Sequence, residues 1–322
     1  MRNYPWLQAH QQRLALALDS GRLGHAPLLS GPPGLGKREL AEWLLARILC
    51  LAEPGQAPCG QCRACELRSS GTHPDLFRVG IPEEKSEIPV DSVRDLIASL
   101  QLTPSIGHRR LGLIEPAESM NRNAANALLK TLEEPAANAW LILVSHRPER
   151  LPATIRSRCQ QLTVRPPEPP EADAWLASQY SKHPPAERSR ALSLAAGAPL
   201  AAAELLDGDG MHLGRQVLDA MLAVASGAPV SSATSAQWQS DPVRTWTWLA
   251  CWTAAFMRQA HGLDSDALPA GLQLPVALPG SRLAGHWEQA LQGRRLAERA
   301  LRHDLLLGKW LLEWGQSFQS GP

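Results

Sequence analysis

The stretch LLSGPPGLGKRELAEW, Leu28 to Trp43, decides how the first part of this chain folds. A short apolar run at 26–29 leads into a glycine-rich loop, and from Lys37 onward the apolar residues recur at helical spacing. Strand, glycine-rich loop and helix is the arrangement of a phosphate-binding loop, whose pattern is G-x-x-x-x-G-K-[ST]. The candidate phosphate-binding residues are Gly31, Gly34, Gly36 and Lys37.

The last position of this pattern is not met. Arg38 stands where a Ser or Thr hydroxyl would bind Mg²⁺. The acid expected after a later strand is Glu115, and the next position, where a water-activating carboxylate is expected, is Pro116. We therefore expect ATP binding to be weak or absent and the chain to have no ATPase activity of its own. The glycines, Lys37 and the positive helix N-terminus still favour phosphate.

Outward from this loop, apolar strands and amphipathic helices alternate. This alternation predicts an α/β domain with a parallel sheet and helices on both faces. The first helix should bury Leu40, Leu44, Ile48 and Leu51. The expected strands are 26–29, 75–81, 110–116, 139–145 and 161–164, and the later helices are 89–104, 121–135 and 151–160.

The rest of the chain reads as helical. The proline-rich stretch 165–173 is expected to be a linker, and a second break is expected at 205–210. A helix at 241–262 has a clear start, because Asp241 can cap it and Pro242 suits its first position. Seven of the 11 tryptophans lie at or beyond Trp238, and at helical spacing they indicate packing. The expected domains are 1–165 (α/β, with a cysteine module at 50–65), 166–207 (small helical lid) and 208–322 (all-helical).

Four cysteines follow the phosphate-loop helix in the pattern C-x8-C-x2-C-x2-C. Thiolates at this spacing can converge on one tetrahedral zinc ion, and a full four-thiolate shell leaves no open position, so its role is structural. Disulfides suit this short span poorly, and an iron–sulfur cluster is the second alternative. The predicted ligands of one structural Zn²⁺ are Cys50, Cys59, Cys62 and Cys65.

Composition narrows the function classes. The 322 residues are 44% hydrophobic, their formal net charge is +1, and no stretch is long and apolar enough to span a bilayer. The N-terminal residues lack the apolar core of a secretory signal, so we expect a soluble, cytoplasmic protein without membrane contact. The near-neutral charge means that DNA contact would depend on local patches or on partner chains.

Several segments together resemble one family over roughly the first half of the chain. GTHPDLF (71–77), NAANALLKTLEEP (123–135), RLPATIRSRCQ (150–160) and the cysteine insertion are similar to bacterial clamp-loader AAA+ subunits. The opening YPWLQAHQQRL (4–14) and the damaged loop resemble those members that do not hydrolyse ATP. The resemblance implies a P-loop AAA+ domain with a zinc-binding insertion, a helical lid and an all-α C-terminal collar.

The same resemblance implies partners and a role in trans. In the family, the Ser-Arg-Cys motif directs an arginine into the ATP site of the adjacent motor subunit, and here that residue is Arg158. The implied partners are the gamma/tau motor subunits and a delta subunit in a hetero-oligomeric ring, with the sliding clamp and primed DNA reached through the complex. The family's sensor-2 arginine would align near Leu200, a third loss in the nucleotide site.

Three other functions remain open from the residues. An active AAA+ ATPase, either a motor subunit or a DNA-remodelling helicase, conflicts with Arg38 and Pro116. A P-loop kinase with a zinc lid leaves the family-like segments unexplained. A zinc-dependent DNA-binding regulator conflicts with the near-neutral charge and the closed thiolate shell.

Overall fold

The structure, a computed structural model, describes residues 4–231, 238, 240–263, 267–269, 271–297 and 301–319. The chain forms two compact units, Met1–Pro167 and Glu168–Pro322, called here the N-terminal and C-terminal units. In the described residues, no helix is long and apolar enough to cross a membrane.

The N-terminal unit contains a five-stranded parallel sheet in the order β2-β3-β4-β1-β5. The three central strands are almost wholly buried, which explains their continuous apolar sequences. All five predicted strands are confirmed. They are β1 (Pro27–Ser30), β2 (Leu76–Val79), β3 (Arg110–Ile114), β4 (Ala139–Ser145) and β5 (Gln160–Thr163).

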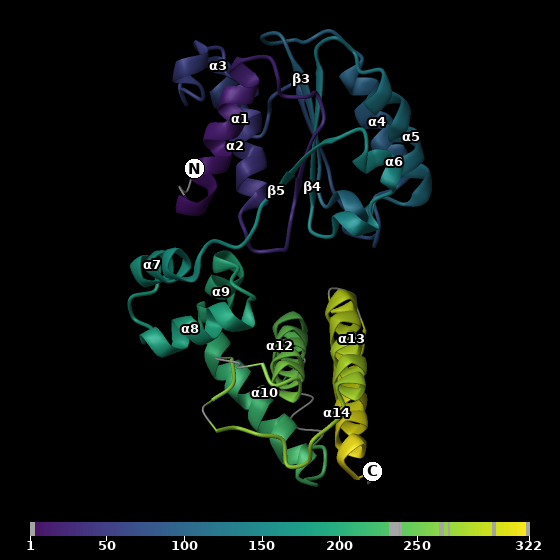
Figure 1. Cartoon of the computed structure of the whole chain (residues 1–322). Helices are drawn as coiled ribbons and strands as arrows, with labels where there is room; N and C mark the ends of the chain where they lie inside the picture. The colour runs from purple at the N-terminus through teal and green to yellow at the C-terminus, as the bar shows by residue number, and fades with distance from the viewer. Residues whose placement is uncertain are drawn as a thin grey trace. The chain divides into compact units, whose positions relative to one another are not determined.

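Helices cover both faces of this sheet (Figure 1). One layer is α1 (Gln8–Asp19), α2 (Lys37–Leu49) and α3 (Arg63–Ser69), and the other is α4 (Val90–Leu100), α5 (Arg122–Glu133) and α6 (Ala153–Arg156). The α4–α5 layer packs on the sheet through fully buried residues such as Val93, Leu128 and Leu143. Asn121 caps α5 by accepting a hydrogen bond from the backbone N–H of Ala124.

Helices are the only regular secondary structure in the described residues of the C-terminal unit. It consists of α7 (Pro169–Gln179), α8 (Pro185–Leu194), α9 (Pro199–Leu206), α10 (Gly210–Ala225), α12 (Pro242–Ala260), α13 (Gly280–Leu296) and α14 (His303–Gln319). Its core is rich in tryptophan. Trp248 stacks on Trp252 at 5.3 Å between ring centroids, and Trp310 stacks on Trp314 at 5.5 Å. The indole N–H of Trp314 donates to the carbonyl of Met221, so this buried polar atom is satisfied. These contacts confirm that the late tryptophans serve packing.

Three details of the expected elements are wrong. The proposed linker at 165–173 ends early, because α7 begins at Pro169: proline lacks only an N–H that the first helical turn does not use. Leu51 is 49% exposed, since α2 ends at Leu49 and the chain leaves the helical path there. The helix expected at 151–160 shrinks to the four residues of α6, which places Arg158 in the segment before β5. The cap and start of α12 at Asp241 and Pro242 are confirmed.

Candidate functional site

The phosphate loop runs from the end of β1 to the start of α2 at Lys37. Three of its glycines have positive φ angles: 141° at Gly31, 74° at Gly34 and 80° at Gly36. Such angles are rare for residues with a Cβ, so the loop shape depends on glycine at these positions. The structure thus brings the predicted phosphate-binding residues together on one loop.

Lys37 is directed into the protein. Only 2% of it is exposed, and its Nζ donates a 2.6 Å hydrogen bond to the carbonyl oxygen of Pro32 in the same loop. Burial lowers the pKa of Lys37 to about 8, while Glu118, Glu115 and Glu39 act in the opposite direction. The lysine is therefore bonded to its own loop and interacts electrostatically with three carboxylates.

Arg38 occupies the position of the metal-binding hydroxyl residue of a phosphate loop, and it forms an ion pair with Glu115. The Arg38 Nε and a Glu115 carboxylate oxygen are 3.2 Å apart, and the Arg38 side chain is 71% exposed. Burial raises the pKa of Glu115, and the charge of Arg38 works against that rise. A guanidinium here repels a dication and occupies the acid that would help to hold one. Arg38, which departs from the phosphate-loop pattern in the sequence, therefore also changes the charge and the contacts of the site.

Sequence reasoning missed three polar residues that end or follow β3 and β4, namely Glu118, Ser145 and His146. Glu118 accepts a hydrogen bond from the backbone N–H of His146, and both residues interact electrostatically with Lys37. Ser145, the fully buried last residue of β4, accepts a hydrogen bond from the backbone N–H of Arg147. The sequence did contain a signal for them, namely polar residues at the end of an apolar strand. Ligands of parallel sheets bind at the carboxyl ends of the strands, so polar residues there are candidates for a ligand site.

The N-terminal segment closes over the same loop. The Trp6 indole N–H donates a 3.0 Å hydrogen bond to the carbonyl of Leu35, and the Trp6 ring stacks on Tyr4 at 5.2 Å. Tyr4 and Leu7 also lie against Gly36, where an added Cβ would come within 3.0 Å of Leu7. The opening segment thus packs directly on the phosphate loop.

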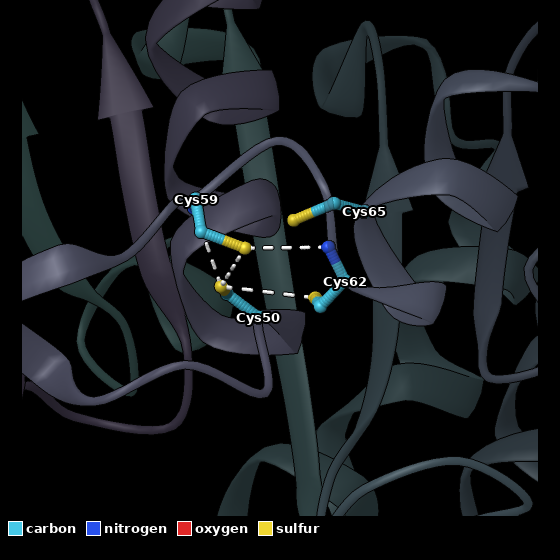
Figure 2. Close-up of side chains that lie close together, drawn as sticks. All are labelled: Cys50, Cys59, Cys62 and Cys65. Atoms are coloured by element: carbon cyan, nitrogen blue, oxygen red, sulfur yellow. Dashed lines mark hydrogen bonds between the residues drawn. The ribbon is translucent and has the colours of Figure 1, made fainter.

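The four cysteines of the insertion converge on one point (Figure 2). Their sulfur atoms all lie within 4.8 Å of one another. The sulfur of Cys50 is 3.6 Å from that of Cys59 and 4.0 Å from that of Cys62. Zn–S bonds near 2.3 Å in a tetrahedron place sulfurs about 3.8 Å apart, so the donor set fits a zinc ion. Within the described residues no cysteines form a disulfide.

Backbone N–H groups favour thiolates at this cluster. The N–H of Cys59 points at the sulfur of Cys50, the N–H of Cys62 at Cys59, and the N–H of Leu51 at Cys62, at 3.4–3.5 Å. Burial opposes ionisation of Cys62, but hydrogen bonds from backbone N–H groups and from the Cys65 and Cys59 side chains outweigh it and lower the pKa of Cys62 to about 6. Burial raises the pKa of Cys65, which lies inside α3, to about 12.

The motif at 71–77 has a structural role. The carboxylate of Asp75 is fully buried and accepts hydrogen bonds from the backbone N–H groups of Ser105 and Ile106 at 2.8 and 2.7 Å. It also lies 3.3 Å from the guanidinium of Arg110, which is itself buried. Asp75 therefore fixes the loop before β3 through these two backbone hydrogen bonds, and its charge is paired with a buried guanidinium.

Arg158 and the phosphate loop lie at opposite ends of the strands of the sheet. The loop follows the carboxyl end of β1, whereas Arg158 precedes the amino end of β5, and these two strands are parallel neighbours. Each strand has four residues at about 3.3 Å each, so its two ends are on the order of 13 Å apart. The Arg158 side chain is 34% exposed, and its Nε donates a 2.7 Å hydrogen bond to Glu133.

Glu133 is the last residue of α5, and it holds the guanidinium of Arg158 from one side. The Nη2 of Arg158 also contacts the Glu133 carboxylate, and its Nη1 donates to the carbonyl of Thr154 at 3.0 Å. The arginine is thus oriented by its own chain and remains accessible at the surface.

Comparison with known proteins adds the family. A family model described as "DNA polymerase III, delta subunit" matches residues 7–168. DNA polymerase III subunit delta' of Pseudomonas aeruginosa is 36% identical over 321 residues, which cover 97% of both chains. DNA polymerase III subunit tau of Escherichia coli is 34% identical over 185 residues, 58% of this chain and 28% of the relative. A gamma subunit-related protein of Thermotoga maritima aligns over 97% of this chain and 99% of its own, with 16% identity and a TM-score of 0.48.

Proposed function

This chain belongs to the delta' family of DNA polymerase III, and we propose that it is a clamp-loader subunit that hydrolyses no ATP and supplies Arg158 to a neighbour's ATP site. The observation that carries the proposal is the separation of the two features within one sheet. The phosphate loop lies at the carboxyl ends of the strands and Arg158 at the amino ends, so the arginine cannot serve the loop of its own chain.

The state of the loop supports the absence of hydrolysis. Arg38 pairs with Glu115 where a hydroxyl and an acid would together hold Mg²⁺, and Pro116 takes the place of the second carboxylate. Lys37 is bonded to its own loop. Leu200, at the second position of α9, offers no cation where the family carries its sensor-2 arginine. Any nucleotide binding here would have to displace these internal contacts.

The proposed action in trans follows from the chemistry of phosphoryl transfer. Negative charge spreads over the γ-phosphate oxygens in the transition state, and a cation placed against them lowers the barrier. The guanidinium of Arg158 is charged at any physiological pH, and its planar fork matches two phosphate oxygens. Its exposed position at the edge of the sheet allows a second subunit to approach it.

The four cysteines are proposed to hold one structural Zn²⁺. The ion would supply four bonds that close the insertion, and no substrate-binding position would remain open. The residues that would hold it are Cys50, Cys59, Cys62 and Cys65, whose sulfurs already have suitable spacing.

The proposed partners are the gamma/tau motor subunits and a delta subunit in a hetero-oligomeric ring. The likeness of this chain to subunits named delta' and tau supports this assignment. The sliding clamp and primed DNA would be reached through that complex. We assign 166–207 to a lid and 208–322 to a collar that holds the ring together, although buried residues from Ala172 to Trp314 form one hydrophobic cluster.

An active AAA+ ATPase remains the second candidate because the loop backbone is intact. Steady-state ATPase measurement on the pure chain separates the two. We expect turnover at background level, and hydrolysis that disappears in Lys37→Ala would establish the motor function instead.

The proposed role of Arg158 is tested in the assembled complex. A cation that reaches a neighbour's γ-phosphate contributes on the order of a thousandfold to turnover at that site. Arg158→Ala should therefore depress the DNA- and clamp-stimulated ATPase rate, diluted by sites that use other arginines. The complex should still elute whole in gel filtration.

Arg156→Ala, in α6 just before Arg158, is the close control, and Arg165→Ala removes the same charge from beyond the other end of β5. Arg158→Lys should rescue only part of the rate, since an ammonium lacks the planar fork. Equal rates in all three alanine variants would show a general charge effect and refute the assignment.

A further inference from the structure

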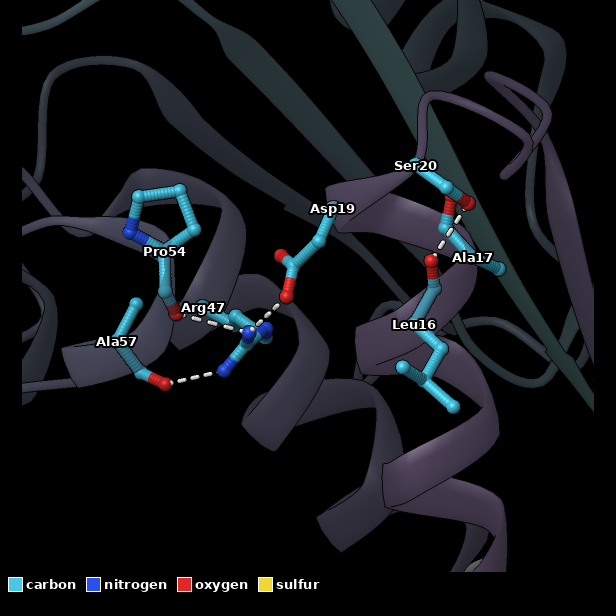
Figure 3. A network of polar contacts seen from close by, with 7 residues as sticks. All are labelled: Leu16, Ala17, Asp19, Ser20, Arg47, Pro54 and Ala57. Atoms are coloured by element: carbon cyan, nitrogen blue, oxygen red, sulfur yellow. Dashed lines mark hydrogen bonds and ion pairs between the residues drawn. The ribbon is translucent and has the colours of Figure 1, made fainter.

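Arg47 lies one turn before Cys50 on α2 and is bound to the loop that connects Cys50 with Cys59 (Figure 3). Its side chain is only 9% exposed. The Nη1 of Arg47 donates to the carbonyl of Ala57, and its Nη2 donates to the carbonyl of Pro54 at 2.8 Å. The same Nη2 lies 2.7 Å from the carboxylate of Asp19, at the end of α1. One guanidinium thus joins two helices and the cysteine loop.

The loop at 51–58 has few other restraints. It contains one short 3₁₀ turn, Pro54–Gln56, whose backbone hydrogen bonds stay within the loop at Glu53, Gln56 and Ala57. A cavity of about 330 Å³ adjoins it, lined by Asp19, Arg47, Leu51, Ala57, His108 and Arg109 among others. Because this space leaves the loop partly unsupported, its path between the two cysteines depends on the two carbonyls that Arg47 holds.

Stability of the fold does not account for this arrangement. Asp19 is 36% exposed, and ion pairs with an exposed partner contribute about 0–1 kcal/mol. The remaining two contacts are made to backbone carbonyls of the cysteine loop and not to an acid. The contacts therefore serve the position of the loop more than they serve the attachment of α1 to α2.

We propose that Arg47 is a positioning residue for the four-thiolate site: it holds Cys59 in reach of Cys50 before the metal binds. This inference rests on the proposed zinc site. Groups that orient metal ligands from outside the coordination shell typically change metal affinity by about 10–100-fold when they are removed. A loop that is free before binding must lose its conformational freedom on binding, which weakens affinity in the same direction.

The test uses the full chain and a chromophoric chelator that competes with it for zinc, so that the equilibrium gives the zinc affinity of the chain. Arg47→Ala should bind zinc about 10–100 times more weakly than the unmodified chain. Arg47→Lys should fall between them, because one ammonium cannot span both carbonyls and Asp19. Asp19→Asn should have a small effect, since both carbonyl contacts remain.

Arg63→Ala is the matched control. Arg63 is exposed and lies between Cys62 and Cys65, so its removal takes the same charge from nearer the ligands. We expect its zinc affinity to equal that of the unmodified chain. The visible absorption of the Co²⁺-substituted protein gives a second readout, because a distorted thiolate shell shifts and weakens the tetrahedral bands. If Arg47→Ala fails to fold, Arg47→Lys retains the charge and the stem and carries the test.

The outcomes separate the inference from the proposed function. Zinc-free protein after purification without chelators would refute the metal site itself. Bound zinc with equal affinity in the unmodified chain, Arg47→Ala and Arg47→Lys would refute the role of Arg47 and leave the metal site intact. An equal loss of zinc affinity in Arg63→Ala would assign the effect to charge alone and would also refute the role of Arg47.

Discussion

Replacing Lys37 by methionine should stabilise the N-terminal unit at neutral pH. Burial lowers the pKa of Lys37 from 10.5 to about 8, and one pKa unit corresponds to about 1.36 kcal/mol, so the protonated lysine costs the folded unit about 3 kcal/mol at pH 7. Methionine removes this cost but leaves the carbonyl of Pro32 without its donor, a loss of about 1 kcal/mol. The net gain is about 2 kcal/mol.

The gain should depend on pH in a defined window. Between pH 8 and pH 10.5 the unfolded chain binds more protons at Lys37 than the folded chain does, so the stability of the unmodified protein rises with pH there. The methionine variant lacks this rise. Its advantage is therefore complete below pH 8, shrinks through the window, and becomes a deficit of about 1 kcal/mol above it.

Scanning calorimetry of the full chain at pH 7 and pH 10 measures the effect. For a unit of this size a gain of 2 kcal/mol raises the melting temperature by about 4–8 °C. The exposed Lys130→Met on α5 controls for loss of a helical lysine. A lower melting temperature of Lys37→Met at pH 7, or the same difference at both pH values, would show that the lysine is not destabilised by burial. Clamp loading by the reconstituted complex should remain nearly intact, because the loop is proposed to be catalytically idle.

Three further changes test the other contacts. Cys62→Ser should lower the zinc content by elemental analysis from about one per chain towards zero and loosen the insertion locally, while the sheet keeps its own core; unchanged zinc would contradict the ligand set. Asp75→Ala should lower the free energy of unfolding by about 3–5 kcal/mol in urea titrations, because it leaves buried Arg110 unpaired; a loss under 1 kcal/mol would show that water reaches the pair. Glu133→Ala should reproduce part of the ATPase loss of Arg158→Ala and add nothing to it in the double variant, with Glu134→Ala as the control; additive losses would mean that the two side chains act independently.

The parallel sheet could be predicted because its strands are buried on both faces and therefore appear as apolar runs such as 139–145. The start of α7 could not be placed from its prolines, because proline both ends helices and occupies their first turn. Leu51 fitted the helical period by chance, and only the chain path after Leu49 shows that it is exposed. Periodicity therefore identifies elements and does not fix their ends.

The residues of the candidate sites also divide into those that the sequence could predict and those that it could not. Cys50 to Cys65 and Lys37 lie within short motifs, so their spacing alone carried the prediction. Glu118 and Arg47 were missed because their contacts depend on tertiary structure. The carboxylate of Glu118 accepts a hydrogen bond from the backbone N–H of a residue 28 positions away. Arg47 and Asp19, which also form a hydrogen bond, are likewise 28 positions apart in the sequence. No local pattern distinguishes such residues from the many solvated charges of a surface.

The intact glycines of the loop are not evidence that nucleotide binds there. A Cβ at Gly31 would lie 2.1 Å from the carbonyl oxygen of Val164, and one at Gly36 would lie 3.0 Å from Leu7. Both glycines are therefore required by the packing of β5 and of the N-terminal segment, whether or not phosphate is bound. Arg38, at the position of the metal-binding hydroxyl, is 71% exposed and free of such packing constraints. The fold alone therefore accounts for the loop shape, while the position that Mg²⁺ binding would need holds an arginine, and this supports the proposal that the chain acts through Arg158.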